Sequence, residues 1–84
     1  MEYRMSDAVL FDARADGIAV ITLNRPDTRN ALSAEVRDGL RAAWERFERN
    51  TALRVAILTG AGDKAFCAGG DLKAMVADGM QVPP

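Results

Sequence analysis

Residues 18–60, IAVITLNRPDTRNALSAEVRDGLRAAWERFERNTALRVAILTG, are the stretch that decides the fold. Its first six residues are apolar on both faces apart from Thr22, which is typical of a strand covered on both sides. Residues 55–59 form a second short apolar run, which Gly60-Ala61-Gly62 ends. When a helix connects two strands of one sheet, the strands pair in parallel and the helix covers one face. The stretch therefore predicts an α/β fold.

The residues between these two strands have helical spacing. Pro26 ends the first strand, because it lacks a backbone N–H and restricts the residue before it. Ser33 is a good N-cap, and Glu35 sits in the first turn, where the helix dipole favours a negative charge. Gly39 lowers helix stability by about 1 kcal/mol relative to alanine without ending the helix. We expect a helix over about residues 33–49, with Trp44 and Phe47 substantially buried on an apolar face of Val36, Leu40, Ala43, Trp44 and Phe47.

Outside this stretch, the chain predicts one more strand and one more helix. Every second residue from Val9 to Ala13 is apolar, and Asp16-Gly17 is a turn signal. Residues 9–14 and 17–23 are therefore expected to form an antiparallel hairpin. Residues 71–77 could form a short helix directly after Gly69-Gly70. The predicted order is hairpin, helix, parallel strand, glycine loop and short helix.

Composition narrows the class of protein. The chain has 84 residues, 49% hydrophobic and 27% charged, with a formal net charge of -1, as in a globular protein. Basic and acidic residues are interspersed, so no nucleic-acid partner is expected. There is no histidine and Cys67 is the single cysteine, so neither a metal site nor a disulfide is expected. No apolar run approaches the roughly 20 residues of a membrane span, so we expect no membrane partner and a cytoplasmic location.

Two glycine-containing segments are candidate sites. Residues 60–65 match a relaxed dinucleotide-binding fingerprint, but that fingerprint needs a helix to begin within it. Gly69-Gly70 would break such a helix, so this interpretation is disfavoured. In residues 65–73, N–H groups near Gly70 would point outward at the start of the following helix, where they suit an anion or a developing oxyanion. A glycine turn with Asp71 as helix N-cap explains the same residues equally well.

The loop at residues 25–32 is a third candidate. It carries Arg25 and Arg29 just before a helix, and guanidinium groups bind phosphates well. A solvated connection explains the same charges, and on the loop's own residues that interpretation is favoured.

Four segments together resemble the crotonase superfamily, to which the enoyl-CoA hydratases and isomerases belong. They are Thr22-Leu23-Asn24-Arg25-Pro26, Asn30-Ala31-Leu32-Ser33, Ile57-Leu58-Thr59-Gly60 and Ala65-Phe66-Cys67-Ala68-Gly69-Gly70-Asp71-Leu72-Lys73. Each segment alone is a weak signal, whereas the ordered set is specific to the superfamily and covers about residues 9–76. The resemblance implies that residues 1–84 are the N-terminal part of a single crotonase-like domain, the start of a ββα superhelix. The remainder of that domain is absent from this chain.

The resemblance also implies an acyl-CoA site. Its catalytic group in this chain is the backbone N–H of Gly70, the first of two donors to the thioester oxygen. The segment lining the substrate comprises Ala68, Gly69, Gly70, Asp71 and Leu72, with main-chain groups of Ala68 near the adenine. Arg29 and Ala31 resemble the part that meets the CoA moiety, and Lys73 adds a further cation. Coenzyme A is part of the substrate, so no cofactor is expected.

The implied activity is acyl-CoA thioester processing, with hydration of a 2-enoyl-CoA as the first expectation. Isomerase, hydrolase, decarboxylase or dehalogenase activity stays open, because the family's second donor and catalytic carboxylates lie beyond Pro84. The intact protein is expected to be an enzyme and a homo-trimer or dimer of trimers. The alternative is a non-catalytic CoA-binding half-domain, if the chain ends at Pro84. Cys67 is expected to pack, since no histidine or other obvious base could activate it.

Overall fold

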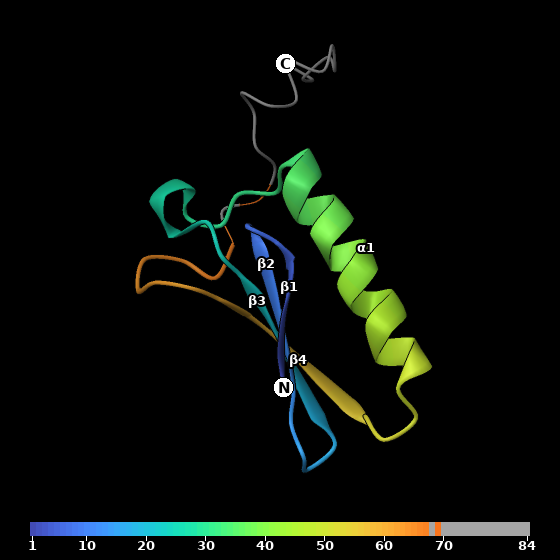
Figure 1. Ribbon diagram of the computed structural model, residues 1–84. Helices are drawn as coiled ribbons and strands as arrows, with labels where there is room; N and C mark the ends of the chain where they lie inside the picture. The colour runs from blue at the N-terminus through green and yellow to red at the C-terminus, as the bar shows by residue number, and fades with distance from the viewer. Residues whose placement is uncertain (68, 70–84) are drawn as a thin grey trace.

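The computed structural model describes residues 1–67 and residue 69. Four strands form one sheet in the order β1-β2-β3-β4, and the single α-helix of the described residues lies along one face of it (Figure 1). This mixed sheet with a covering helix confirms the α/β prediction. The elements in chain order are β1 (Glu2–Ser6), β2 (Val9–Ala13), β3 (Ile18–Leu23), the 3-10 helix η1 (Pro26–Thr28), α1 (Ala34–Arg49) and β4 (Val55–Gly60).

Strand pairing follows the prediction for β2, β3 and β4. β2 and β3 are antiparallel, with Phe11 opposite Ile21. β3 and β4 are parallel, with Val20 opposite Ile57, as the helical crossover between them requires. The antiparallel hairpin and the parallel strand are therefore both confirmed.

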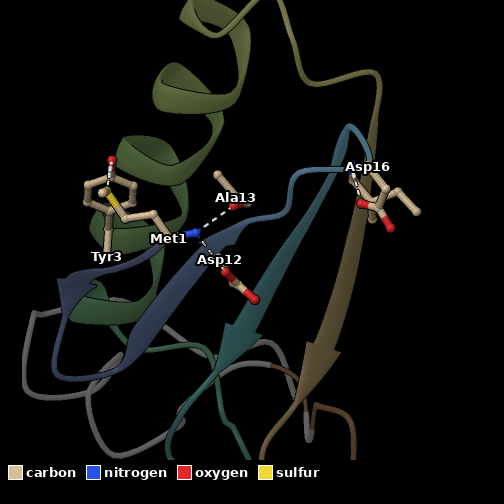
Figure 2. Close-up of polar contacts among 6 residues, drawn as sticks. Met1, Tyr3, Asp12, Ala13 and Asp16 are labelled. Atoms are coloured by element: carbon tan, nitrogen blue, oxygen red, sulfur yellow. Dashed lines mark hydrogen bonds and ion pairs between the residues drawn. The ribbon is translucent and has the colours of Figure 1, made fainter.

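β1 is a strand that was not predicted from the sequence. It pairs antiparallel with β2, and Tyr3 lies opposite Phe11 with the ring centroids 6.2 Å apart. Figure 2 shows how its N-terminal end is held: the Met1 ammonium group donates a 2.6 Å hydrogen bond to the carbonyl oxygen of Ala13 and lies 3.4 Å from an Asp12 carboxylate oxygen. These contacts fasten the start of the chain to the far end of β2.

The core lies between α1 and the face of β1, β2 and β3 that it covers. Every second residue of β3 is buried, namely Ala19, Ile21 and Leu23, because successive side chains of a strand point to opposite faces. Gly39 lets the helix approach the sheet: a β-carbon at this position would lie 2.7 Å from Cγ2 of Val9. The glycine that weakens the helix locally is therefore the residue that permits its packing.

The predicted burial of Trp44 is wrong. Its side chain is 40% exposed, and it contacts Phe47 edge-on with the ring centroids 6.2 Å apart. Phe47 is half-buried. The buried helix residues are Val36, Gly39 and Ala43. At about 100° per residue, Trp44 lies about 80° around the axis from Val36, which puts it at the edge of the buried stripe.

β4 lies at the edge of the sheet, and three of its apolar side chains are exposed. The exposed fractions are 53% for Val55, 44% for Ile57 and 38% for Leu58. A strand that is apolar on both faces is normally covered on both faces. Within the described residues, β4 is therefore a strand whose covering layer is incomplete. α1, the one α-helix of the described residues, has 16 residues and falls short of the length and hydrophobicity that a membrane span requires.

Candidate functional site

Two loops begin side by side at one edge of the sheet. The parallel strands β3 and β4 end there together, with Leu23 paired to Gly60. The amide of Ala61 continues this pairing with a 2.7 Å hydrogen bond to the carbonyl oxygen of Leu23. Carboxyl ends of parallel strands are where α/β proteins commonly place their ligands. The first loop, residues 24–33, leads into α1, and the second comprises residues 61–67 and Gly69 among the described residues (Figure 1).

The first loop is a tight turn built on two left-handed residues. After η1, Arg29 and Asn30 have φ values of 54° and 58°. Non-glycine residues adopt this region rarely, and asparagine adopts it more readily than most. The amide of Asn30 returns to the carbonyl oxygen of Arg25 at 2.8 Å, which closes the turn. Ser33 then caps α1 by accepting a 3.3 Å hydrogen bond from the amide of Val36, as predicted.

Asn30 joins the two loops. Its side chain is completely buried, and its Nδ2 donates hydrogen bonds of 3.0 Å to the carbonyl oxygens of both Ala61 and Ala65. Its Oδ1 accepts a 2.9 Å bond from the amide of Arg25. Asn30 belongs to a motif of the resemblance, but no role was predicted for it. The one local property that could have pointed to Asn30 is the tolerance of asparagine for left-handed backbone. This property does not predict that the side chain is buried.

The second loop packs tightly against the first. A β-carbon on Gly60 would overlap the carbonyl oxygen of Phe66 and come within 2.6 Å of Nδ2 of Asn30, so glycine is required for this approach. Further along, the amide of Leu32 donates a 2.6 Å hydrogen bond to the carbonyl oxygen of Gly69. Gly69 has φ of 91°, a conformation that glycine adopts without strain.

The sequence of the second loop carries both a relaxed match to a dinucleotide-binding fingerprint and a cysteine that is expected to pack. No helix begins within residues 61–67, so the condition that a dinucleotide-binding fingerprint imposes is not met there. Cys67 is half-buried, packs against the core and accepts a 3.4 Å hydrogen bond from the amide of Gly69. This position supports the packing role expected for the thiol.

The predicted site residues fall into two groups. Arg29 is exposed in the first loop, and Ala31 is 8% exposed, with its carbonyl oxygen 3.3 Å from a guanidinium nitrogen of Arg25. Ala31 and Gly69 are brought together because Leu32, next to Ala31, bonds to Gly69. The predicted helix at residues 71–77 lies outside the described residues. The same holds for the other predicted site residues, which are Ala68, Gly70, Asp71, Leu72 and Lys73.

Comparison with known proteins decides the family. A family model for enoyl-CoA hydratase/isomerase matches residues 13–82. The chain belongs to the enoyl-CoA hydratase/isomerase family. Its fold is that of the family's N-terminal portion, as a crystal structure of an enoyl-CoA hydratase from Mycobacterium tuberculosis H37Rv indicates. That structure superposes with a TM-score of 0.79 at 46% identity, over 86% of this chain and 28% of its own.

Two relatives of known sequence extend the comparison. YngF of Bacillus subtilis, named as an enoyl-CoA hydratase/isomerase, is 51% identical over 82% of this chain and 26% of its own length. The (E)-benzylidenesuccinyl-CoA hydratase of Thauera aromatica is 46% identical over 67% of this chain and 22% of its own length. The chain thus spans about a quarter of the length of these family members.

The composition of the second loop leaves its main chain open to close approach by another group. The side chains of residues 60–62 and of Ala65 and Gly69 are small or missing, so peptide groups can be approached closely. Hydrogen bonds from Asn30 and Leu32 hold three carbonyl oxygens of this segment in fixed places. A loop fastened at several points can present its remaining N–H groups in a preorganised direction.

Proposed function

We propose that these 84 residues are the N-terminal part of a single crotonase-like domain, and that the complete protein processes acyl-CoA thioesters, with hydration of a 2-enoyl-CoA as its reaction. The observation that carries the proposal is the 2.6 Å hydrogen bond from Leu32 to Gly69, which fastens the peptide just before Gly70 in a chain of this family. Two of the compared relatives are hydratases by name, which supports hydration over other reactions of the family.

In this proposal the backbone N–H of Gly70 is the first donor to the thioester oxygen. Addition of water to an enoyl thioester builds negative charge on that oxygen, and a preorganised donor is worth about 3–4 kcal/mol in the transition state. A second donor and the acid–base carboxylates come from the rest of the domain. No cofactor is required, because coenzyme A enters as part of the substrate.

The remaining predicted residues bind the substrate. Arg29 is exposed and therefore free of the desolvation that burial would impose, which suits a guanidinium group that pairs with CoA phosphates. Ala31 follows it in the same loop. Lys73 adds a cation, and the segment that lines the acyl-CoA comprises Ala68, Gly69, Gly70, Asp71 and Leu72.

The exposed apolar side chains of β4 support the proposal that these residues are part of a larger domain. Val55, Ile57 and Leu58 of β4 need a cover, which a further segment of the same domain supplies in this proposal. We further propose that the complete protein is a homo-trimer or dimer of trimers and is located in the cytoplasm, in keeping with a chain that has a single cysteine and no apolar run of membrane length.

The test is to purify the complete protein that contains these residues and to follow the absorbance of a four-carbon 2-enoyl-CoA. We expect saturable loss of the enoyl-thioester band, with water added across the double bond in the product. Assays for double-bond migration, thioester hydrolysis and decarboxylation run in parallel on matched acyl-CoA substrates. If the protein turns over a substrate in one of these assays and does not hydrate the enoyl-CoA, that other reaction replaces hydration in the proposal. Absence of any acyl-CoA binding would overturn the proposal as a whole.

A further inference from the structure

We infer that Asn30 is a positioning residue for the glycine loop, and that its carboxamide sets where the peptide before the proposed oxyanion donor lies. The inference rests on the proposed function for its catalytic consequence. It begins from three contacts: Nδ2 bonds the carbonyl oxygens of Ala61 and Ala65 at 3.0 Å, and Oδ1 bonds the amide of Arg25 at 2.9 Å.

These contacts connect parts of the chain that are distant in sequence. Asn30 is 31 residues before Ala61 and 35 residues before Ala65, so no local turn places the three residues together. The side chain has no exposed surface, so bulk water does not reach these two carbonyl oxygens while Asn30 is in place. Without Asn30, the two carbonyl oxygens of the second loop lose the donor that the structure gives them.

Few side chains can satisfy this geometry. The position needs two donors and one acceptor on a short side chain, attached to a backbone with φ of 58°. Asparagine has all of these and tolerates the left-handed region. Aspartate keeps the acceptor but, when ionised, has no donor, and glycine keeps the backbone conformation but has no side chain.

The same loop is held at a second point two residues further along. Leu32 donates to the carbonyl oxygen of Gly69 at 2.6 Å, so Asn30 and Leu32 fasten Ala61 and Gly69 to one short turn. A β-carbon on Gly60 would lie 2.6 Å from Nδ2 of Asn30, so the two residues pack closely where the loop begins. A displacement of Asn30 therefore moves the segment that leads to Gly70, and a displacement of about 1 Å at a reacting group lowers turnover on the order of 100-fold.

The experiment compares Asn30→Asp and Asn30→Gly with a matched control, Asn24→Asp, in the complete protein. Asn24 also donates from Nδ2 to a carbonyl oxygen, that of Asp7 at 3.2 Å, but it does so in an exposed contact that does not involve the glycine loop. We expect kcat for the four-carbon 2-enoyl-CoA to fall on the order of 100-fold in both Asn30 variants and to stay near wild type in the control. The KM should change much less than kcat, because the loss falls on the transition state.

A spectroscopic readout separates positioning from folding and from the proposed function. Butyryl-CoA labelled with ¹³C at the thioester carbonyl binds without an enoyl group to hydrate, and hydrogen-bond donors lower the frequency of its carbonyl stretch. In wild type and Asn24→Asp the bound frequency should lie below that of the free thioester. In both Asn30 variants, most of this downshift should be lost.

Each outcome has a distinct meaning. If wild type binds butyryl-CoA without a downshift, the proposed oxyanion site is wrong. If wild type shows the downshift and both Asn30 variants keep it together with wild-type kcat, the inference is overturned while the proposed function stands. If both Asn30 variants fail to fold and Asn24→Asp folds, Asn30 is a determinant of the fold, which also overturns its assignment as a positioning residue.

Discussion

The backbone amide of Leu32 lies 2.6 Å from the carbonyl oxygen of Gly69 and donates a hydrogen bond to it. Leu32 immediately precedes the N-cap of α1, so this bond connects the entry of the helix to the end of the glycine loop. Asn30 connects the same turn to the beginning of that loop. The two loops at the carboxyl ends of β3 and β4 therefore form one hydrogen-bonded unit.

Replacing Gly70 tests the proposed oxyanion donor. In the complete protein, Gly70→Pro removes a backbone N–H and should lower kcat on the order of 100-fold or more, whereas Gly70→Ala keeps the N–H and should cost much less. Steady-state hydration assays on both variants, with circular dichroism to check folding, make the comparison. Wild-type turnover in a folded Gly70→Pro variant would show that the donor is another group.

Replacing Arg29 tests contact with the CoA phosphates. Arg29→Ala should raise KM for an acyl-CoA less than about tenfold and leave kcat nearly unchanged, because an exposed charge contact is worth about 1 kcal/mol and acts equally on ground and transition states. The effect should shrink as salt is added. A substrate without the nucleotide portion is the control, and an equal effect on that substrate would assign Arg29 to the fold.

The backbone at Arg29 calls for a second variant. Its φ of 54° is unfavourable for both arginine and alanine because each carries a β-carbon, so Arg29→Ala removes the charge and leaves the backbone strain unchanged. Arg29→Gly removes the charge and accommodates the left-handed conformation. The two variants should give the same rise in KM, and a large difference between them would measure strain instead of phosphate binding.

Replacing Gly39 tests the packing of α1 on β2. A β-carbon there would lie 2.7 Å from Cγ2 of Val9 and 2.8 Å from Oγ of Ser6. Gly39→Ala should therefore destabilise the protein by about 1–3 kcal/mol of overpacking, partly offset by the roughly 1 kcal/mol that alanine adds to helix stability. Urea unfolding would measure this, with the exposed neighbour Arg41→Ala as control. A rise in stability for Gly39→Ala would mean that helix and sheet lie further apart than the structure shows.

Residues 1–84 alone should not hydrate an enoyl-CoA. Proton transfer to carbon and activation of water need a carboxylate or imidazole beside the substrate, and the chain has no histidine. The helix carboxylates are exposed, as their spacing predicted: Glu35, Asp38, Glu45 and Glu48. The check is to purify this segment, confirm its mass and follow the enoyl-thioester absorbance. Turnover above buffer that Asp71→Asn abolishes would contradict the prediction and would place acid–base chemistry within these residues.

Local chemistry was enough to predict several elements of this protein. Ser33 begins α1 because a hydroxyl at that position satisfies a free amide of the first turn, and this is a property of neighbouring residues. The parallel pairing of β3 and β4 follows from the helix between them. The motifs identified the family without any structure, because they occur along the chain in the order that is typical of the family.

Only the tertiary structure decided which residues those elements bury and connect. Trp44 has the spacing of a core residue, but the helix packs with Gly39 toward Val9, and this orientation leaves Trp44 at the edge. Asn30 is polar and lies in a loop, yet it is completely buried, because carbonyl groups from residues far along the chain surround its amide. The start of a helix depends on residues a few positions apart. The burial of a side chain depends on which distant segments of the chain pack against it, and for Asn30 these segments meet only in the folded sheet.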